Sequence, residues 1–93
     1  MHISKFNSIN GIPDQNQIRE WTEGYFQNLL MMLNSFLAHA SVEEAVERMA
    51  QVPFRQLVTE ALEGESEAII KLAVEIIDEK AASELEYMRA YLE

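Results

Sequence analysis

Cysteine is absent from this 93-residue chain, so neither a disulfide framework nor a thiolate zinc site can form. Long apolar runs are absent too, because the longest, at residues 29–33, has five residues, whereas a bilayer-spanning helix needs roughly 20. The first ten residues lack the apolar core of a secretory signal. We therefore expect a cytoplasmic protein that does not insert into a membrane.

Basic residues are scarce: seven Lys and Arg stand against sixteen Asp and Glu, which gives a net charge of -9. A phosphate backbone would repel such a surface, so nucleic-acid binding is disfavoured. The acidic residues gather in the second half of the chain and either keep the protein solvated or dock onto a basic partner. The candidate acidic surface consists of Glu60, Glu63, Glu65, Glu67, Asp78 and Glu79.

Glycine and proline are also few, at three and two residues, and 48% of the chain is hydrophobic, which is typical of a folded domain. Residues 1–13 differ, because they are rich in Ser and Asn and contain the turn signal Asn10-Gly11. Apolar residues recur there at every third position, Ile3, Phe6, Ile9 and Ile12. We expect residues 1–13 to form a flexible or docked arm and residues 14–93 to form a single helical domain.

The strongest pattern in the sequence is a helical stripe between residues 14 and 40. Asp14 is a candidate N-cap, and Gln17 is placed to reach back to it as in a capping box. Apolar residues then follow a 3.6-residue period for more than six turns. The main stripe is Ile18, Trp21, Tyr25, Leu29, Met32, Leu33, Phe36 and Ala40, and Phe26, Leu30 and Leu37 widen it.

Three further helices are expected after this one. A capping box at Ser41 starts the second helix, and Pro53 breaks it because proline removes a backbone donor. A third helix over 54–62 stops near Gly64, and a fourth runs from about Ser66 to residue 92, with a nearly all-apolar first half. The sequence predicts an all-α fold: a small helical bundle of two long helices, about 14–40 and 66–92, and a middle segment broken at Pro53 into two short helices.

Candidate catalytic residues are few. His39 and Glu43 suggest a metal or acid-base pair, but a histidine in the last turn of a helix more commonly interacts with the helix dipole. The segment 41–62 has the helix, break, helix outline of a DNA-reading motif, yet acidic residues follow Arg55. Phosphate-binding and nucleophile motifs are missing. We expect no enzymatic activity, no cofactor and no metal.

The excess of apolar residues on the first helix is the most informative feature for function. Met31 falls on the side opposite the main stripe, so this helix is either central in the monomer or shared with a second chain. Methionine and aromatic side chains suit surfaces that repack against partners. The predicted interface residues are Trp21, Tyr25, Phe26, Leu30, Met31, Leu37, Tyr87 and Tyr91.

The sequence therefore favours a protein–protein interaction module, an adaptor, chaperone-like or regulatory protein, that binds a protein partner through apolar helix surfaces. It also predicts self-association as a homodimer, because a two-fold axis lets one patch cover its own copy. The alternative is an acidic inhibitor, or nucleic-acid mimic, that blocks a basic site on a target protein.

Overall fold

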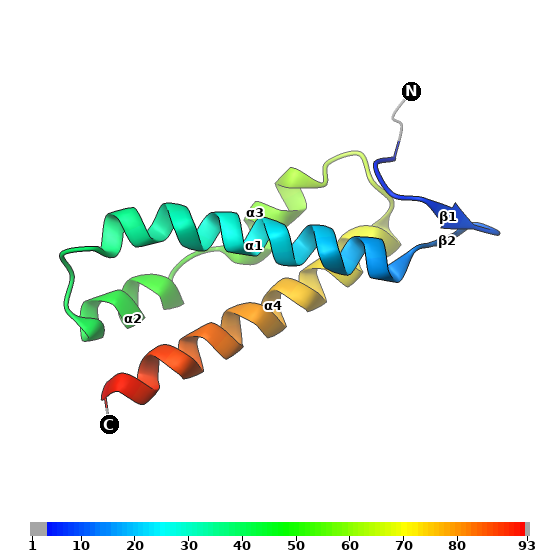
Figure 1. The fold of residues 1–93 in the computed structure, drawn as a ribbon. Helices are drawn as coiled ribbons and strands as arrows, with labels where there is room; N and C mark the ends of the chain where they lie inside the picture. The colour runs from blue at the N-terminus through cyan, green and yellow to red at the C-terminus, as the bar shows by residue number, and fades with distance from the viewer. Residues whose placement is uncertain (1–3, 93) are drawn as a thin grey trace.

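Four helices account for most of residues 4–92, the part of the chain that the computed structural model describes, apart from the side chains of Ile9 and Leu92. They are α1 (Gln15–Leu37), α2 (Val42–Ala50), α3 (Phe54–Ala61) and α4 (Glu67–Arg89), and the 3-10 turn η1 (Ala90–Leu92) follows (Figure 1). A short hairpin, β1 (Ser8–Ile9) and β2 (Ile12–Pro13), precedes α1. The predicted all-α fold with two long and two short helices is confirmed.

The helix starts follow from their N-caps. The Asp14 carboxylate accepts hydrogen bonds from the backbone N–H groups of residues 16 and 17, and the hydroxyls of Ser41 and Ser66 each accept one from the residue three positions later. α1 ends at Leu37, earlier than the predicted Ala40, whose N–H bonds to the Leu37 carbonyl at 3.0 Å. Ser41 has to be extended to cap α2, so the preceding residues form the turn.

The middle segment is broken where proline predicts it. α2 ends at Ala50, Val52 donates a turn hydrogen bond to the Met49 carbonyl at 3.2 Å, and α3 begins directly after Pro53. Past the end of α3, Gly64 has a φ of 94°, which a residue with a side chain rarely adopts. The break and the glycine stop both agree with the sequence prediction.

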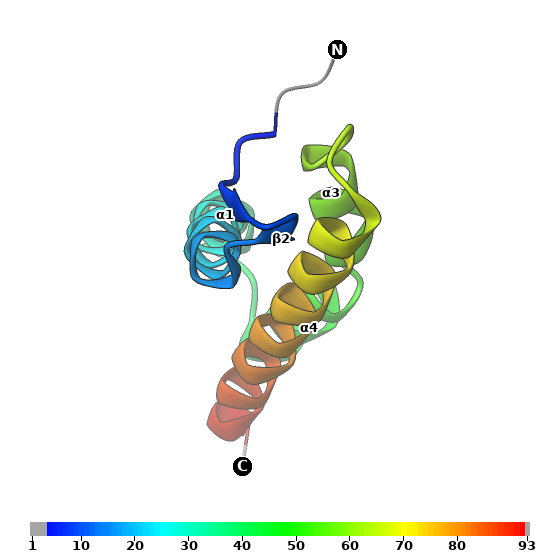
Figure 2. The ribbon, with the colours of Figure 1, turned by 90° about the vertical axis from the view of Figure 1, so that its right-hand side faces the viewer.

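α4 is the central helix of the bundle. α1 packs on one side of it, and α2 and α3 pack on another (Figures 1 and 2). The apolar first half of α4 supplies Ile69, Ala73, Ile76 and Ile77 to the core. Because α2 and α3 form the return segment, α1 and α4 run in the same direction from the hairpin end (Figure 1).

The N-terminal segment lies against the bundle from Ser4 onward. Phe6 is buried in the core, and the carboxylate of buried Glu65 accepts hydrogen bonds from the Ser4 hydroxyl at 2.6 Å and from the Lys5 N–H at 3.0 Å. Gln17 does not close a capping box, because the Asn7 carbonyl already accepts the Asp14 N–H, and the Gln17 amide oxygen accepts the Asn7 N–H instead. Ile3 of the predicted every-third pattern lies outside the described residues.

Candidate interaction surface

One side of α1 is buried in the core near the start of the helix and exposed to solvent near its end. Ile18 and Phe36 are five full turns apart at 3.6 residues per turn, so they lie on the same side of α1. Ile18 is fully buried, Phe26 is 2% exposed, Leu33 is half-buried and Phe36 is 75% exposed. The hydrophobic core therefore ends before the C-terminal end of α1.

This exposure corrects one sequence prediction. Met32 and Phe36 were expected in the main stripe that packs into the bundle, but Met32 is 62% exposed as well. α1 and α4 diverge away from the hairpin end, and α2 packs mainly on α4 and η1 (Figure 1). No helix of the described chain therefore covers the second half of α1 on this side.

Most of the exposed large hydrophobic side chains gather at this end of the molecule. Seven such side chains occur in the described part of the chain, and four of them fall between residues 31 and 42. Met32 and Phe36, one turn apart on the same side of α1, form what we call the distal patch, whereas Met31 is on the opposite side of α1 and Val42 is the first residue of α2. Two more, Tyr87 and Tyr91, are near the C-terminal end of α4, whereas Ile12 is in the hairpin at the opposite end.

The distal patch lies in the longest uncharged stretch of the sequence. Residues 24–42 contain no Asp, Glu, Lys or Arg, although 25% of the whole chain is charged. The exposed sides of α1 in this stretch carry Gln27, Asn28, Asn34 and Ser35, which are polar but neutral. The absence of charge over this stretch is a sequence signal for the patch that helical periodicity does not register.

The predicted interface residues divide into surface and interior groups. Met31 is exposed, Leu30 and Leu37 are half-buried, and Tyr87 and Tyr91 are exposed and joined by a 2.8 Å hydrogen bond between their hydroxyls. The ring of Phe26, by contrast, is buried 5.3 Å from that of Phe54, measured between centroids. Phe26 is thus a core residue, because it lies on the face of α1 that the other helices cover.

Trp21 and Tyr25 have partners within the chain. Their rings stack 5.1 Å apart, and Phe6 meets the Trp21 ring edge-on at 6.0 Å. The Tyr25 hydroxyl donates a 3.1 Å hydrogen bond to the Leu57 carbonyl, which ties α1 to α3. Burial, together with the negative charge of Glu60, raises the pKa of Tyr25. Tyr25 therefore fixes α1 against α3, and Trp21 holds the N-terminal segment against α1.

The predicted acidic residues do not form one surface. Glu60, Glu63 and Glu67 are exposed around the turn between α3 and α4, and Glu79 is exposed further along α4. Asp78 pairs with Arg55, with a closest nitrogen–oxygen distance of 2.6 Å. Glu65 is buried and holds the N-terminal segment, so its placement on the acidic surface is corrected.

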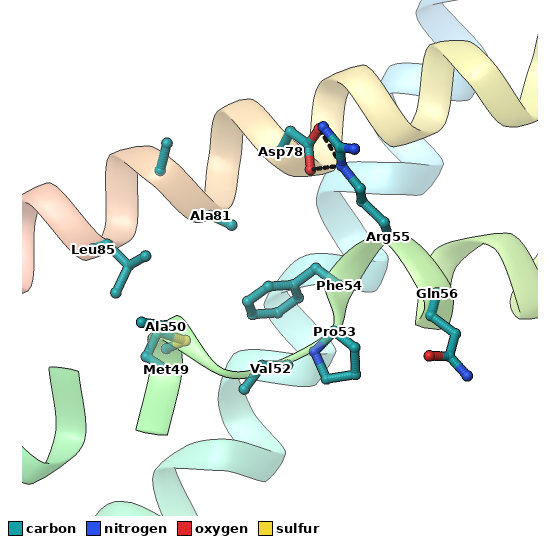
Figure 3. Close-up of a pocket in the computed structure, with 11 residues that line it drawn as sticks. Met49, Ala50, Val52, Pro53, Phe54, Arg55, Gln56, Asp78, Ala81 and Leu85 are labelled. Atoms are coloured by element: carbon teal, nitrogen blue, oxygen red, sulfur yellow. Dashed lines mark hydrogen bonds and ion pairs between the residues drawn. The ribbon is translucent and has the colours of Figure 1, made fainter. Parts of the chain in front are cut away.

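A groove of about 590 Å³ lies between the α2–α3 break and α4. Figure 3 shows Phe54, Met49 and Leu85 around its apolar part and the Arg55–Asp78 pair at one end. Pro53 creates the groove, because the break separates the ends of α2 and α3. Arg55 and Asp78 hold α3 against α4 beside it.

The remaining candidate groups are not brought together. His39 and Glu43 are both exposed, on the two sides of the turn between α1 and α2. Within residues 4–92, no three acidic or histidine side chains are grouped closely enough to hold a metal ion. None of the helices in this range has both the length and the apolar character needed to cross a membrane.

Comparisons with known protein families, with curated proteins and with solved structures give no match.

Proposed function

We propose that this chain is a protein–protein interaction module, of the adaptor, chaperone-like or regulatory kind, and that its distal patch binds an apolar helix face of another polypeptide chain. The observation that carries the proposal is the 75% exposure of Phe36. This residue lies on the side of α1 that is buried in the core at Ile18. A helix laid along this side would continue the packing that α4 provides near Ile18.

The energetics support an occupied patch. Burying a phenylalanine or methionine side chain contributes about 1.5–3 kcal/mol, so leaving Met32 and Phe36 in water forgoes much of this stabilisation. Unoccupied patches of this kind promote aggregation. Methionine side chains also adapt to the shape of a partner, as they do in grooves that bind amphipathic helices.

The alternative proposal, an acidic inhibitor of a basic site, has less support. Asp78 and Glu65 already have partners within the chain, and Glu79 stands about 18 Å along α4 from Glu67, at 1.5 Å per residue. Salt separates the two proposals, because a charge-driven complex weakens as ionic strength rises and an apolar one does not.

A photo-crosslinking experiment in extracts of the native host tests the function. A photoreactive phenylalanine analogue replaces Phe36 in one variant and Ile12, which is 65% exposed at the opposite end, in a control. We expect adducts with a protein from position 36 at both low and high salt, and few from position 12. If position 36 gives no adducts, the proposal is wrong; adducts that form only at low salt favour the acidic inhibitor.

A further inference from the structure

We propose that the chain bound at the distal patch is a second copy of this protein, with the second half of α1 in each copy packed against its counterpart across a two-fold axis. This inference rests on the function proposed above and names the partner. It has three supports: the surface area of the monomer, the distribution of charge and the position of the patch along α1.

The monomer exposes more surface than its size calls for. Its accessible surface is 6697 Å², whereas a folded monomer of this mass exposes about 5,500 Å². The difference, about 1,200 Å², exceeds the roughly 800 Å² that each partner buries in an interface of standard size. The radius of gyration is 15.1 Å, against about 12 Å for a compact chain of this length. The larger radius reflects an elongated chain, and a second copy seated on the distal patch would bury part of the excess surface.

Charge restricts where two copies can meet. Each carries a net charge of -9, so most surfaces of one copy repel the same surfaces of the other. The side chains of residues 24–42 are the exception, because they include no acidic or basic group other than His39. A partner selected by charge would gain nothing from this stretch, whereas a second copy avoids repulsion there.

The patch also suits a symmetric contact. An interface about a two-fold axis pairs one surface with itself, and residues at the axis meet their own counterparts. The uncharged stretch is centred on Leu33, and Met32, which is exposed, lies beside this centre. Two helices crossing antiparallel there would bring Met32 close to the partner's Met32, with Phe36 on either side of the crossing.

Disulfide cross-linking tests this arrangement, because the natural chain has no cysteine. The variant is Met32→Cys, and the control is Ile12→Cys, which places a thiol at a similarly exposed apolar position in the hairpin. Both are oxidised at micromolar concentration and run on non-reducing gels. A covalent dimer requires Cα atoms about 4.4–6.8 Å apart, a distance that the crossing provides at position 32.

We expect Met32→Cys to form a covalent dimer at least tenfold faster than Ile12→Cys, and we expect excess natural chain, which has no thiol, to reduce the yield. Equal rates for the two variants would overturn the proposal, because they indicate random collision. If the rates are equal but position 36 still forms adducts with a different protein, only the identity of the partner is wrong. If the rates are equal and position 36 also gives no photo-adducts, both the second copy and the proposed function are wrong.

Discussion

Phe26 and Phe36 offer a direct test of where the monomer core ends. They are the same residue type on the same helix, yet Phe26 is 2% exposed and Phe36 is 75% exposed. Replacing each with alanine therefore separates folding from association. Phe26→Ala removes a ring packed against Phe54, whereas Phe36→Ala removes one that the monomer does not cover.

The expected magnitudes differ widely. Truncating a buried phenylalanine costs about 3–5 kcal/mol of unfolding free energy, a large part of the roughly 5–15 kcal/mol by which a domain is stable. Phe36→Ala should change the stability of the monomer by about 0.5 kcal/mol or less. In the dimer, however, two Phe36 rings are lost, at about 1.5–3 kcal/mol each. At 1.4 kcal/mol per tenfold, the dissociation constant rises by about 10²- to 10⁴-fold.

Urea unfolding followed by circular dichroism gives the first quantity, at a concentration low enough to keep the chain monomeric. Sedimentation equilibrium gives the dissociation constant of the dimer. A Phe36→Ala protein as unstable as Phe26→Ala under these conditions would show that Phe36 belongs to the monomer core. Unchanged association would show that Phe36 does not contribute to the interface.

Three further predictions concern the monomer. Gly64→Ala forces a side chain into a left-handed backbone conformation and should lower the unfolding free energy, measured in urea, by about 1–2 kcal/mol. An unchanged free energy would contradict the assigned turn. Glu65→Ala removes the acceptor that holds the N-terminal segment beside Trp21, so the tryptophan emission should shift to longer wavelength, whereas no shift would refute that role. Tyr91→Phe removes the main cause of the raised pKa of Tyr87, so ultraviolet titration should show this pKa falling toward its ordinary value. The Tyr87–Tyr91 contact therefore stabilises the natural protein below about pH 10 and loses this effect as the pH rises through the raised pKa; an unchanged titration would contradict this assignment.

The sequence predicts the helices well because their limits depend on local chemistry. The hydroxyls and carboxylates at Asp14, Ser41 and Ser66 cap the first turn whatever the rest of the chain does. Pro53 likewise breaks the middle segment through its own ring. The end of α1 was placed too late because the connection to Ser41 takes up residues that fit a helical pattern equally well.

The burial of individual residues could not be predicted in the same way. A 3.6-residue period indicates which side of α1 is apolar, but Phe36 is exposed because α4 diverges from α1, and this angle depends on the packing of the whole bundle. The burial of Glu65 was not predictable either, because the groups that contact its carboxylate belong to Ser4 and Lys5, about 60 residues away in sequence. The uncharged stretch at 24–42 is a sequence signal for the patch that periodicity alone does not register.

Light scattering on the natural protein, over a concentration series through the micromolar range, tests the central claim most directly. If the distal patch is covered by a second copy, the measured mass rises with concentration from 10.7 kDa toward twice that value. A mass that stays at 10.7 kDa throughout the series would contradict the dimer.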